Sequence, residues 1–112
     1  MHEMAIAEGI LDIALDYAAR NDARQVQCIS LLLGEMSGVE TESLEFCFAS
    51  LSKGTIAEKA ELRLQRVPLM GRCVKCEQEI HIEGYNFICS KCGSAMELIS
   101  GRELRVEYLE VD

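Results

Sequence analysis

The sequence has few aromatic residues and no long apolar run. Its 112 residues include three Phe, three Tyr and no Trp, although hydrophobic residues make up 49% of the chain. Aliphatic side chains must therefore fill the core, and this length supports one domain or a compact domain with a small insert. No apolar stretch approaches the roughly 20 residues that span a bilayer, and the N-terminus lacks the pattern of a signal peptide. We therefore expect a cytoplasmic protein with no membrane association.

Basic residues are also scarce. The chain has 11 Lys and Arg against 19 Asp and Glu, which gives a formal net charge of −8. Even the cysteine-rich segment 69–99 has only Arg72, Lys75 and Lys91, against four glutamates. A protein that binds nucleic acid needs clustered Lys and Arg to replace phosphate counterions. The charge balance therefore argues against a nucleic-acid partner.

Four of the six cysteines form two Cys-x-x-Cys pairs with twelve residues between them. They are Cys73, Cys76, Cys89 and Cys92. Each pair lets a tight turn aim two sulfurs at one point, and four thiolates suit a tetrahedral zinc ion at about 2.3 Å. Four protein ligands leave no open position, so we expect a structural ion and not a catalytic one. The alternative is that the cysteines are redox dithiols. A redox dithiol is typically a single Cys-x-x-Cys motif that opens a helix, whereas this segment has two matched Cys-x-x-Cys motifs in a strand-like hairpin.

The two remaining cysteines, Cys28 and Cys47, lie in apolar stretches, where they are expected to pack as small apolar residues. One tetrathiolate set plus two separate thiols fits a reducing compartment better than a secreted disulfide framework.

The order of predicted elements is helix, strand, helix, strand, metal module, strand. Apolar spacing of three and four predicts helices over residues 4–19 and from Thr41 onwards, the second capped by the Thr41 hydroxyl. The first helix is expected to bury a stripe. Its members are Ile6, Ile10, Ile13 and Tyr17, widened by Ala7, Leu11, Ala14 and Ala18.

Three strands are expected in the main body, in residues 26–33, 62–65 and 104–108. The first should be buried on both faces, and the other two should be neighbours. The metal module should contain a hairpin with strands at 79–83 and 85–88. The fold class is therefore α+β, with two helices on a three-stranded sheet and an inserted, zinc-ribbon-like four-cysteine domain. The main domain is assigned to residues 1–68 plus 100–112, and the zinc domain to 69–99.

The N-terminus, Met1-His2-Glu3, offers a second metal site. The free α-amine, the deprotonated backbone nitrogen of His2 and its imidazole can close adjacent chelate rings around one ion, and the amide of Glu3 can complete a plane of four nitrogens. Such an array suits nickel(II) or copper(II). By spacing alone, a frayed terminal residue is the better explanation of His2.

Several segments together resemble the HypA/HybF family of nickel-iron hydrogenase maturation proteins, in matching order along the whole chain. They are the opening Met1-His2-Glu3-Met4, residues 33–40, the helix segment 43–48, both cysteine pairs and the ending 104–111. The resemblance implies a nickel-binding α/β domain plus a zinc domain, with His2 as a nickel ligand and the four cysteines of the two pairs as zinc ligands. It leaves open whether Glu3 would contact nickel through its side chain or only its backbone.

The resemblance further implies a non-enzymatic nickel metallochaperone. Its partners would be a GTPase that handles nickel and the hydrogenase large subunit, and it would be a monomer or a weak homodimer. Some family members have a His directly after a knuckle cysteine; here those positions are Glu77 and Gly93, so exchange of sulfur for imidazole on zinc is not expected.

Two other classes compete with this interpretation. A structural zinc-ribbon interaction module without nickel would need only the four cysteines. A hydrolytic zinc enzyme would need an open ligand position and a nearby base, and His81, the only other histidine, is predicted to be an exposed hairpin residue.

Overall fold

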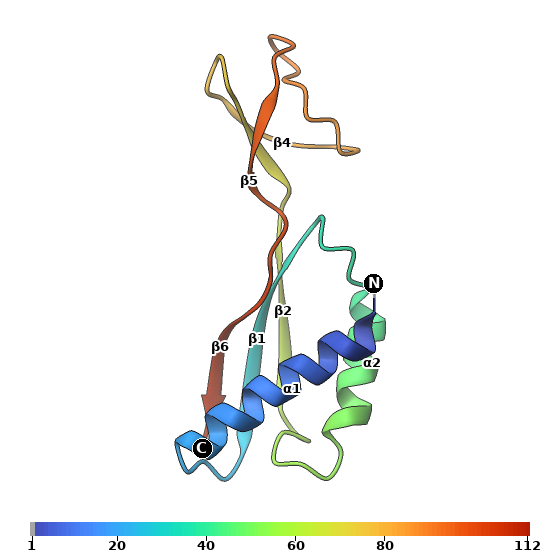
Figure 1. Ribbon diagram of the computed structural model, residues 1–112, viewed down its shortest axis with the longest axis vertical. Helices are drawn as coiled ribbons and strands as arrows, with labels where there is room; N and C mark the ends of the chain where they lie inside the picture. Colours follow the sequence, from blue (N-terminus) through green and yellow to red (C-terminus); the bar gives the residue numbers. More distant parts are fainter. Residues whose placement is uncertain (1) are drawn as a thin grey trace. The chain divides into compact units, whose positions relative to one another are not determined.

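A computed structural model describes residues 2–112, and the chain divides into two compact units (Figure 1). The first contains the chain up to Leu32, Gly38–Gln65 and Arg105–Asp112; the second contains Leu33–Ser37 and Arg66–Leu104. The elements are α1 (Glu3–Arg20), β1 (Val26–Gly34), α2 (Thr41–Ser52), β2 (Glu61–Val67), β3 (Met70–Cys73), β4 (Glu79–His81), β5 (Met96–Ser100) and β6 (Leu104–Val111). The predicted fold class is confirmed: two helices accompany one three-stranded sheet, and the four cysteines of the two Cys-x-x-Cys pairs lie in the second unit.

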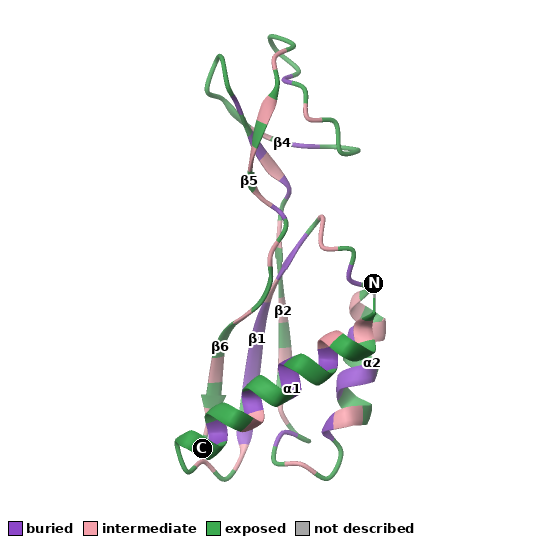
Figure 2. Cartoon of the chain, in the orientation of Figure 1, coloured by how far each residue is buried: buried purple, intermediate pink, exposed green. Residues whose placement is uncertain are grey.

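Helix α1 buries a narrower stripe than its sequence predicts. The buried residues are Ala7, Ile10, Leu11, Ala14 and Ala18. Ile13 and Tyr17 are instead 51% and 44% exposed, so their predicted burial was wrong. Figure 2 shows buried and exposed stretches alternating along α1, as expected of a helix with one face against the core.

Strand β1 is the centre of the first sheet, which has the order β2-β1-β6. Apolar residues on both of its faces are buried, as predicted. The expectation that β2 and β6 are neighbours was wrong, because the strand with the most apolar surface lies between them. Ser30 of β1 is fully buried, and its hydroxyl donates to Glu107 and accepts from Gln65 on the flanking strands.

Helix α2 begins at Thr41, but the residue that caps it is Glu40. The Glu40 carboxylate accepts a hydrogen bond from the Glu42 N–H at 3.3 Å. A carboxylate suits the positive end of the helix dipole. Leu44, Cys47 and Phe48 are buried.

The second unit contains an antiparallel sheet with the order β4-β3-β5. The predicted hairpin strand at 85–88 was wrong: Gly84 and Tyr85 both have a φ of 57°, which ends the extended chain, and only Ile88 makes an isolated bridge, to Ala95. Strand β4 pairs with β3, and Met70 lies opposite His81.

The segment Leu33–Ser37 belongs to the second unit through close backbone contacts. A Cβ atom on Gly34 would overlap the carbonyl of Gly101, and Gly101 itself has a φ of +119°, which favours glycine. The Met36 N–H donates to the Gly101 carbonyl at 2.7 Å. Among residues 2–112, no helix combines the length and apolar character needed to cross a membrane.

Candidate metal centres

Two matched turns of the second unit present the four clustered cysteines. Strand β3 ends at Cys73, whose sulfur accepts hydrogen bonds from the N–H groups of Lys75 and Cys76, each at 3.4 Å. Its carbonyl accepts from the Glu77 N–H at 3.0 Å, and in the second turn the Cys89 carbonyl accepts from the Gly93 N–H at 2.9 Å. Each turn therefore closes in the same way around its first cysteine.

The residue after each pair has a left-handed backbone. Glu77 has a φ of 60° and Gly93 a φ of 75°. Glycine adopts this conformation freely, whereas a residue with a Cβ atom adopts it at a cost. A glycine in this place is a sequence signal for a left-handed residue, whereas Glu77 gives no such signal.

The four sulfurs have the spacing of a tetrahedral metal site. All lie within 4.8 Å of one another, with Cys73 to Cys92 at 3.3 Å and Cys76 to Cys89 at 3.8 Å. Tetrahedral bonds of about 2.3 Å put neighbouring sulfurs roughly 3.8 Å apart. The sulfurs of Cys73 and Cys89 are buried on the inner side, and Cys76 and Cys92 are exposed. The residues therefore fit a bound zinc ion.

The pKa values of the four thiols differ, being lowered for Cys73, Cys89 and Cys92 and raised for Cys76. The backbone N–H of Cys76 lowers the pKa of Cys73, and that of Cys92 lowers the pKa of Cys89. The pKa of Cys92 is lowered by the side chain and backbone of Ser94. For Cys76, the Gln78 N–H lowers the pKa, but contacts with neighbouring sulfurs and desolvation outweigh it and raise the pKa to about 11. A divalent cation at the centre would remove this repulsion and favour four thiolates.

The predicted N-terminal site lies at the start of α1. His2 is exposed and precedes the first helical residue, and its carbonyl accepts a hydrogen bond from the Ile6 N–H at 3.2 Å. Met1, whose amine the prediction needs, lies outside the described residues.

The Glu3 side chain is occupied by a contact that sequence reasoning missed. Its Oε2 accepts a hydrogen bond from the Glu40 N–H at 3.0 Å. This bond is the main reason why the pKa of Glu3 is lowered. The contact fixes the first turn of α1 to the residue that caps α2. The two residues are 37 positions apart, so no local pattern in one sequence could have indicated it.

His81 lies partly exposed in β4, away from the N-terminal residues in sequence and in the other unit of the chain. Its Nε2 atom is 2.8 Å from Oε1 of Glu35, a partner that the sequence did not predict. Among the described residues, the four cysteines are the one His, Cys, Asp and Glu group whose ligand atoms converge on a point.

Comparison with known proteins gives a full-length match. A family model described as "Hydrogenase/urease nickel incorporation, metallochaperone, hypA" matches residues 1–111. The chain belongs to the HypA family. It is 39% identical to the hydrogenase maturation factor HypA of Geobacter metallireducens over 113 residues, with all of both chains covered. It is 40% identical to that of Geotalea daltonii over 112 residues, with 99% of each covered.

Solved HypA structures share the fold of this HypA-family chain. The solution structure of the nickel metallochaperone HypA from Helicobacter pylori aligns with a TM-score of 0.68, covering 99% of this chain and 97% of that one at 20% identity. A second solution structure of a HypA protein aligns with a TM-score of 0.74 over 100% and 97% of the two chains, also at 20% identity. The suspected family resemblance is therefore confirmed, and the chain is a nickel-incorporation metallochaperone of hydrogenase maturation by family.

Proposed function

We propose that this chain binds nickel(II) through its first nitrogens and delivers it to an immature nickel-iron hydrogenase. The ligands would be the Met1 amine, the backbone nitrogen and imidazole of His2, and the amide nitrogen of Glu3. The observation that carries the proposal is the fixed start of α1, where an exposed His2 directly precedes a helix whose first residue is held by Glu40.

In this geometry, the backbone nitrogen of Glu3 and its carboxylate have different roles. The Glu3 carboxylate is bonded to the Glu40 N–H, so we assign the metal contact of Glu3 to its backbone nitrogen. That nitrogen lies at the N-terminus of α1, where the helix dipole stabilises the negative charge of a deprotonated amide. Glu3 therefore acts as a positioning residue that orders the chelating backbone.

Release follows from the same arrangement. An exposed terminal site lets a partner compete for ligand positions without disturbing the core. The imidazole and the amine must both be deprotonated to bind metal, so protons also compete with nickel as the pH falls. The partners we propose are a nickel-handling GTPase and the hydrogenase large subunit, in the cytoplasm. The chain has no catalytic step of its own in this scheme.

The second metal has a different role in the proposal. Zinc bound by Cys73, Cys76, Cys89 and Cys92 would hold the second unit together and stay in place during nickel transfer. Four sulfur ligands leave no position for a substrate, and the two turns enclose two of the four sulfurs. The alternative function is a structural zinc-ribbon interaction module that has no nickel site.

A nickel titration of the untagged chain tests the proposal. Planar nickel(II) has a visible absorption band, which should saturate at stoichiometric nickel and disappear in His2→Ala. His81→Ala is the matched control, because it removes the only other imidazole, and it should leave the band unchanged. Unaltered nickel binding by His2→Ala would contradict the proposed ligand set, and a parent chain that binds no nickel would leave the zinc-ribbon alternative.

A further inference from the structure

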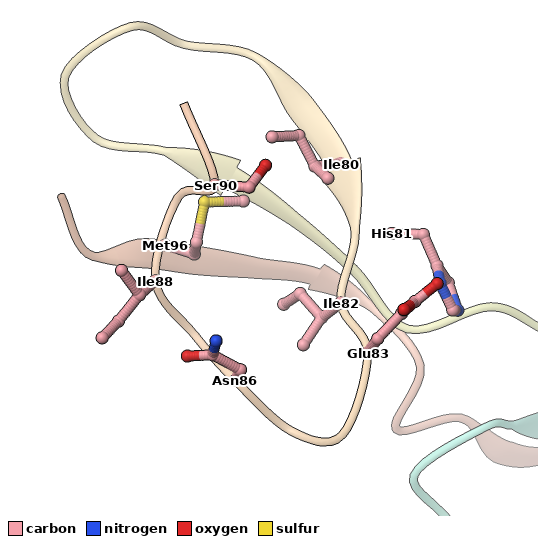
Figure 3. Close-up of a pocket in the computed structure, with 8 residues that line it drawn as sticks. All are labelled: Ile80, His81, Ile82, Glu83, Asn86, Ile88, Ser90 and Met96. Atoms are coloured by element: carbon pink, nitrogen blue, oxygen red, sulfur yellow. The ribbon is translucent and has the colours of Figure 1, made fainter. Parts of the chain in front are cut away.

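The second unit contains a cavity that no metal site uses. It has a volume of about 350 Å³ and lies between the segment 80–83, the loop 86–90 and β5. Figure 3 shows four apolar side chains around it, those of Ile80, Ile82, Ile88 and Met96. Ile82 is buried, whereas Ile88 is 58% exposed at the edge. Such a volume is at the lower end of ligand pockets, so it suits one or two side chains and not a large cofactor.

Two hydrogen-bond acceptors lie together at one end of this lining. Nε2 of His81 is 2.8 Å from Oε1 of Glu35, and a carboxylate only accepts, so Nε2 carries the proton. The Glu35 carboxylate stays ionised because the Leu69 N–H and His81 lower its pKa. In the neutral imidazole Nδ1 is then an acceptor, and it lies 4.0 Å from Oε1 of Glu83.

The second acceptor is the carboxylate of Glu83, which lies on the solvent side of His81. Its side chain is 89% exposed, and its carboxylate also only accepts. Two acceptors at this separation have no proton to share, and a donor placed between them would bond to both. Asn86 and Ser90 add further polar groups to the lining (Figure 3).

We propose that this cavity docks an extended segment of a partner protein, with a large aliphatic side chain inside it and an adjacent lysine or arginine on the Nδ1 atom of His81 and the carboxylate of Glu83. An apolar recess with a polar edge is the usual form of a site that takes one anchoring side chain. An ammonium or guanidinium group supplies several N–H donors and a positive charge opposite to that of Glu83.

Charge and geometry select this occupant over others. The chain has a net charge of −8, so a basic segment is attracted and an acidic one is repelled. A metal ion fits poorly, because among the described residues no three His, Cys, Asp or Glu ligand atoms converge at this cavity. The surface is separate from the proposed nickel ligands, so it can be tested on nickel-free protein.

The test uses zinc-loaded full-length chain and capped peptides, with binding followed by amide chemical shifts. One peptide has a central leucine flanked by lysines; in two others, glutamates replace the lysines or alanine replaces the leucine. The leucine–lysine peptide should shift the amides of residues 80–90 and bind at least about fivefold more tightly than either control. Equal binding of the three peptides, or none at millimolar concentration, would overturn the proposal.

Variants separate the two halves of the site. Ile88→Ser should weaken the leucine–lysine peptide at least about fivefold, and Glu83→Gln should weaken it about threefold, the size expected of an exposed ion pair. Ile99→Ser, at an exposed isoleucine outside the lining, should have no effect. Retained zinc and an unchanged spectrum elsewhere show that each variant is folded. A different outcome is that the chain binds no peptide but self-associates, and that Ile88→Ser abolishes the self-association. The occupant of the cavity would then be a second copy of the chain, which would contradict the proposal.

Discussion

At the residue scale, two glutamates connect segments that are distant in sequence. The Glu3 carboxylate binds the Glu40 N–H, and the Glu35 carboxylate binds the Leu69 N–H at 2.9 Å as well as His81. Hydrogen bonds to a charged group are stronger than those between neutral groups. Each glutamate therefore adds a charged hydrogen bond between segments that are far apart in the sequence.

Replacing Glu3 tests its positioning role. In Glu3→Ala the first turn of α1 should lose its attachment, and nickel binding must then also order the terminus. Ordering one backbone residue costs about 1–2 kcal/mol, so nickel affinity should fall roughly tenfold. Glu3→Gln keeps an acceptor oxygen and should restore most of the affinity.

The measurement is competitive nickel titration of both variants with their visible spectra. The planar band should keep its position in Glu3→Ala, because the backbone ligand is still present. A band that moves or disappears would instead make the Glu3 carboxylate a ligand.

Glu35 should contribute to stability in a pH-dependent way. Its pKa is lowered, first by the Leu69 N–H and then by His81, so its contribution is present above the ordinary carboxyl range and is lost as the pH falls through the folded-state pKa. Glu35→Ala should therefore be less stable than the parent chain near neutral pH, and the difference should shrink in acid. Denaturant unfolding of both proteins across that range measures it, and a constant difference would contradict the assigned contact.

At the element scale, the two cysteine turns are matched in backbone but not in sequence. Both need a left-handed residue after the second cysteine, and only the second turn has glycine there, at Gly93. We predict that Glu77→Gly stabilises the zinc-bound state by about 0.5–1 kcal/mol, because relief of the left-handed cost exceeds glycine's added entropy.

Gly93→Ala is the opposite change at the matched position and should weaken zinc retention. Competition with a chromophoric chelator measures both variants. If Glu77→Gly loses zinc more readily than the parent chain, strain at this turn is not the controlling factor.

Sequence periodicity predicted the helices and main strands because those signals are local. It failed where the outcome depends on neighbours: Ile13 and Tyr17 continue the apolar spacing of α1, but the alanines set which face packs. In the insert, β3 pairs with both β4 and β5. The sequences of β3 and β5 have no strong alternation of apolar and polar residues, so they did not predict this pairing.

Of the candidate sites, too, the sequence predicted those that depend on local spacing and missed those that depend on distant contacts. The cysteine cluster follows from spacing, because two short turns dictate where four sulfurs point. The contacts of Glu3 and Glu35 span 37 and 34 or more residues, so only the folded chain reveals them. The nickel ligands themselves stay a prediction.

At the scale of the whole molecule, the two units should differ in their dependence on zinc. In the second unit, Cys73 and Cys89 are among the few buried side chains, so the metal replaces much of a core. Removing zinc should unfold residues 66–104 and leave the amide signals of α1, α2 and β1 dispersed. If the amide signals of both units lost their dispersion together, or if neither did, the units would not be stabilised separately.

The account depends on nickel and zinc using different groups of one chain. The most direct measurement is metal analysis of the untagged chain before and after acetylation of its α-amine. We predict that the acetylated chain keeps stoichiometric zinc and loses the planar nickel band. Undiminished nickel binding after acetylation would contradict the proposed site.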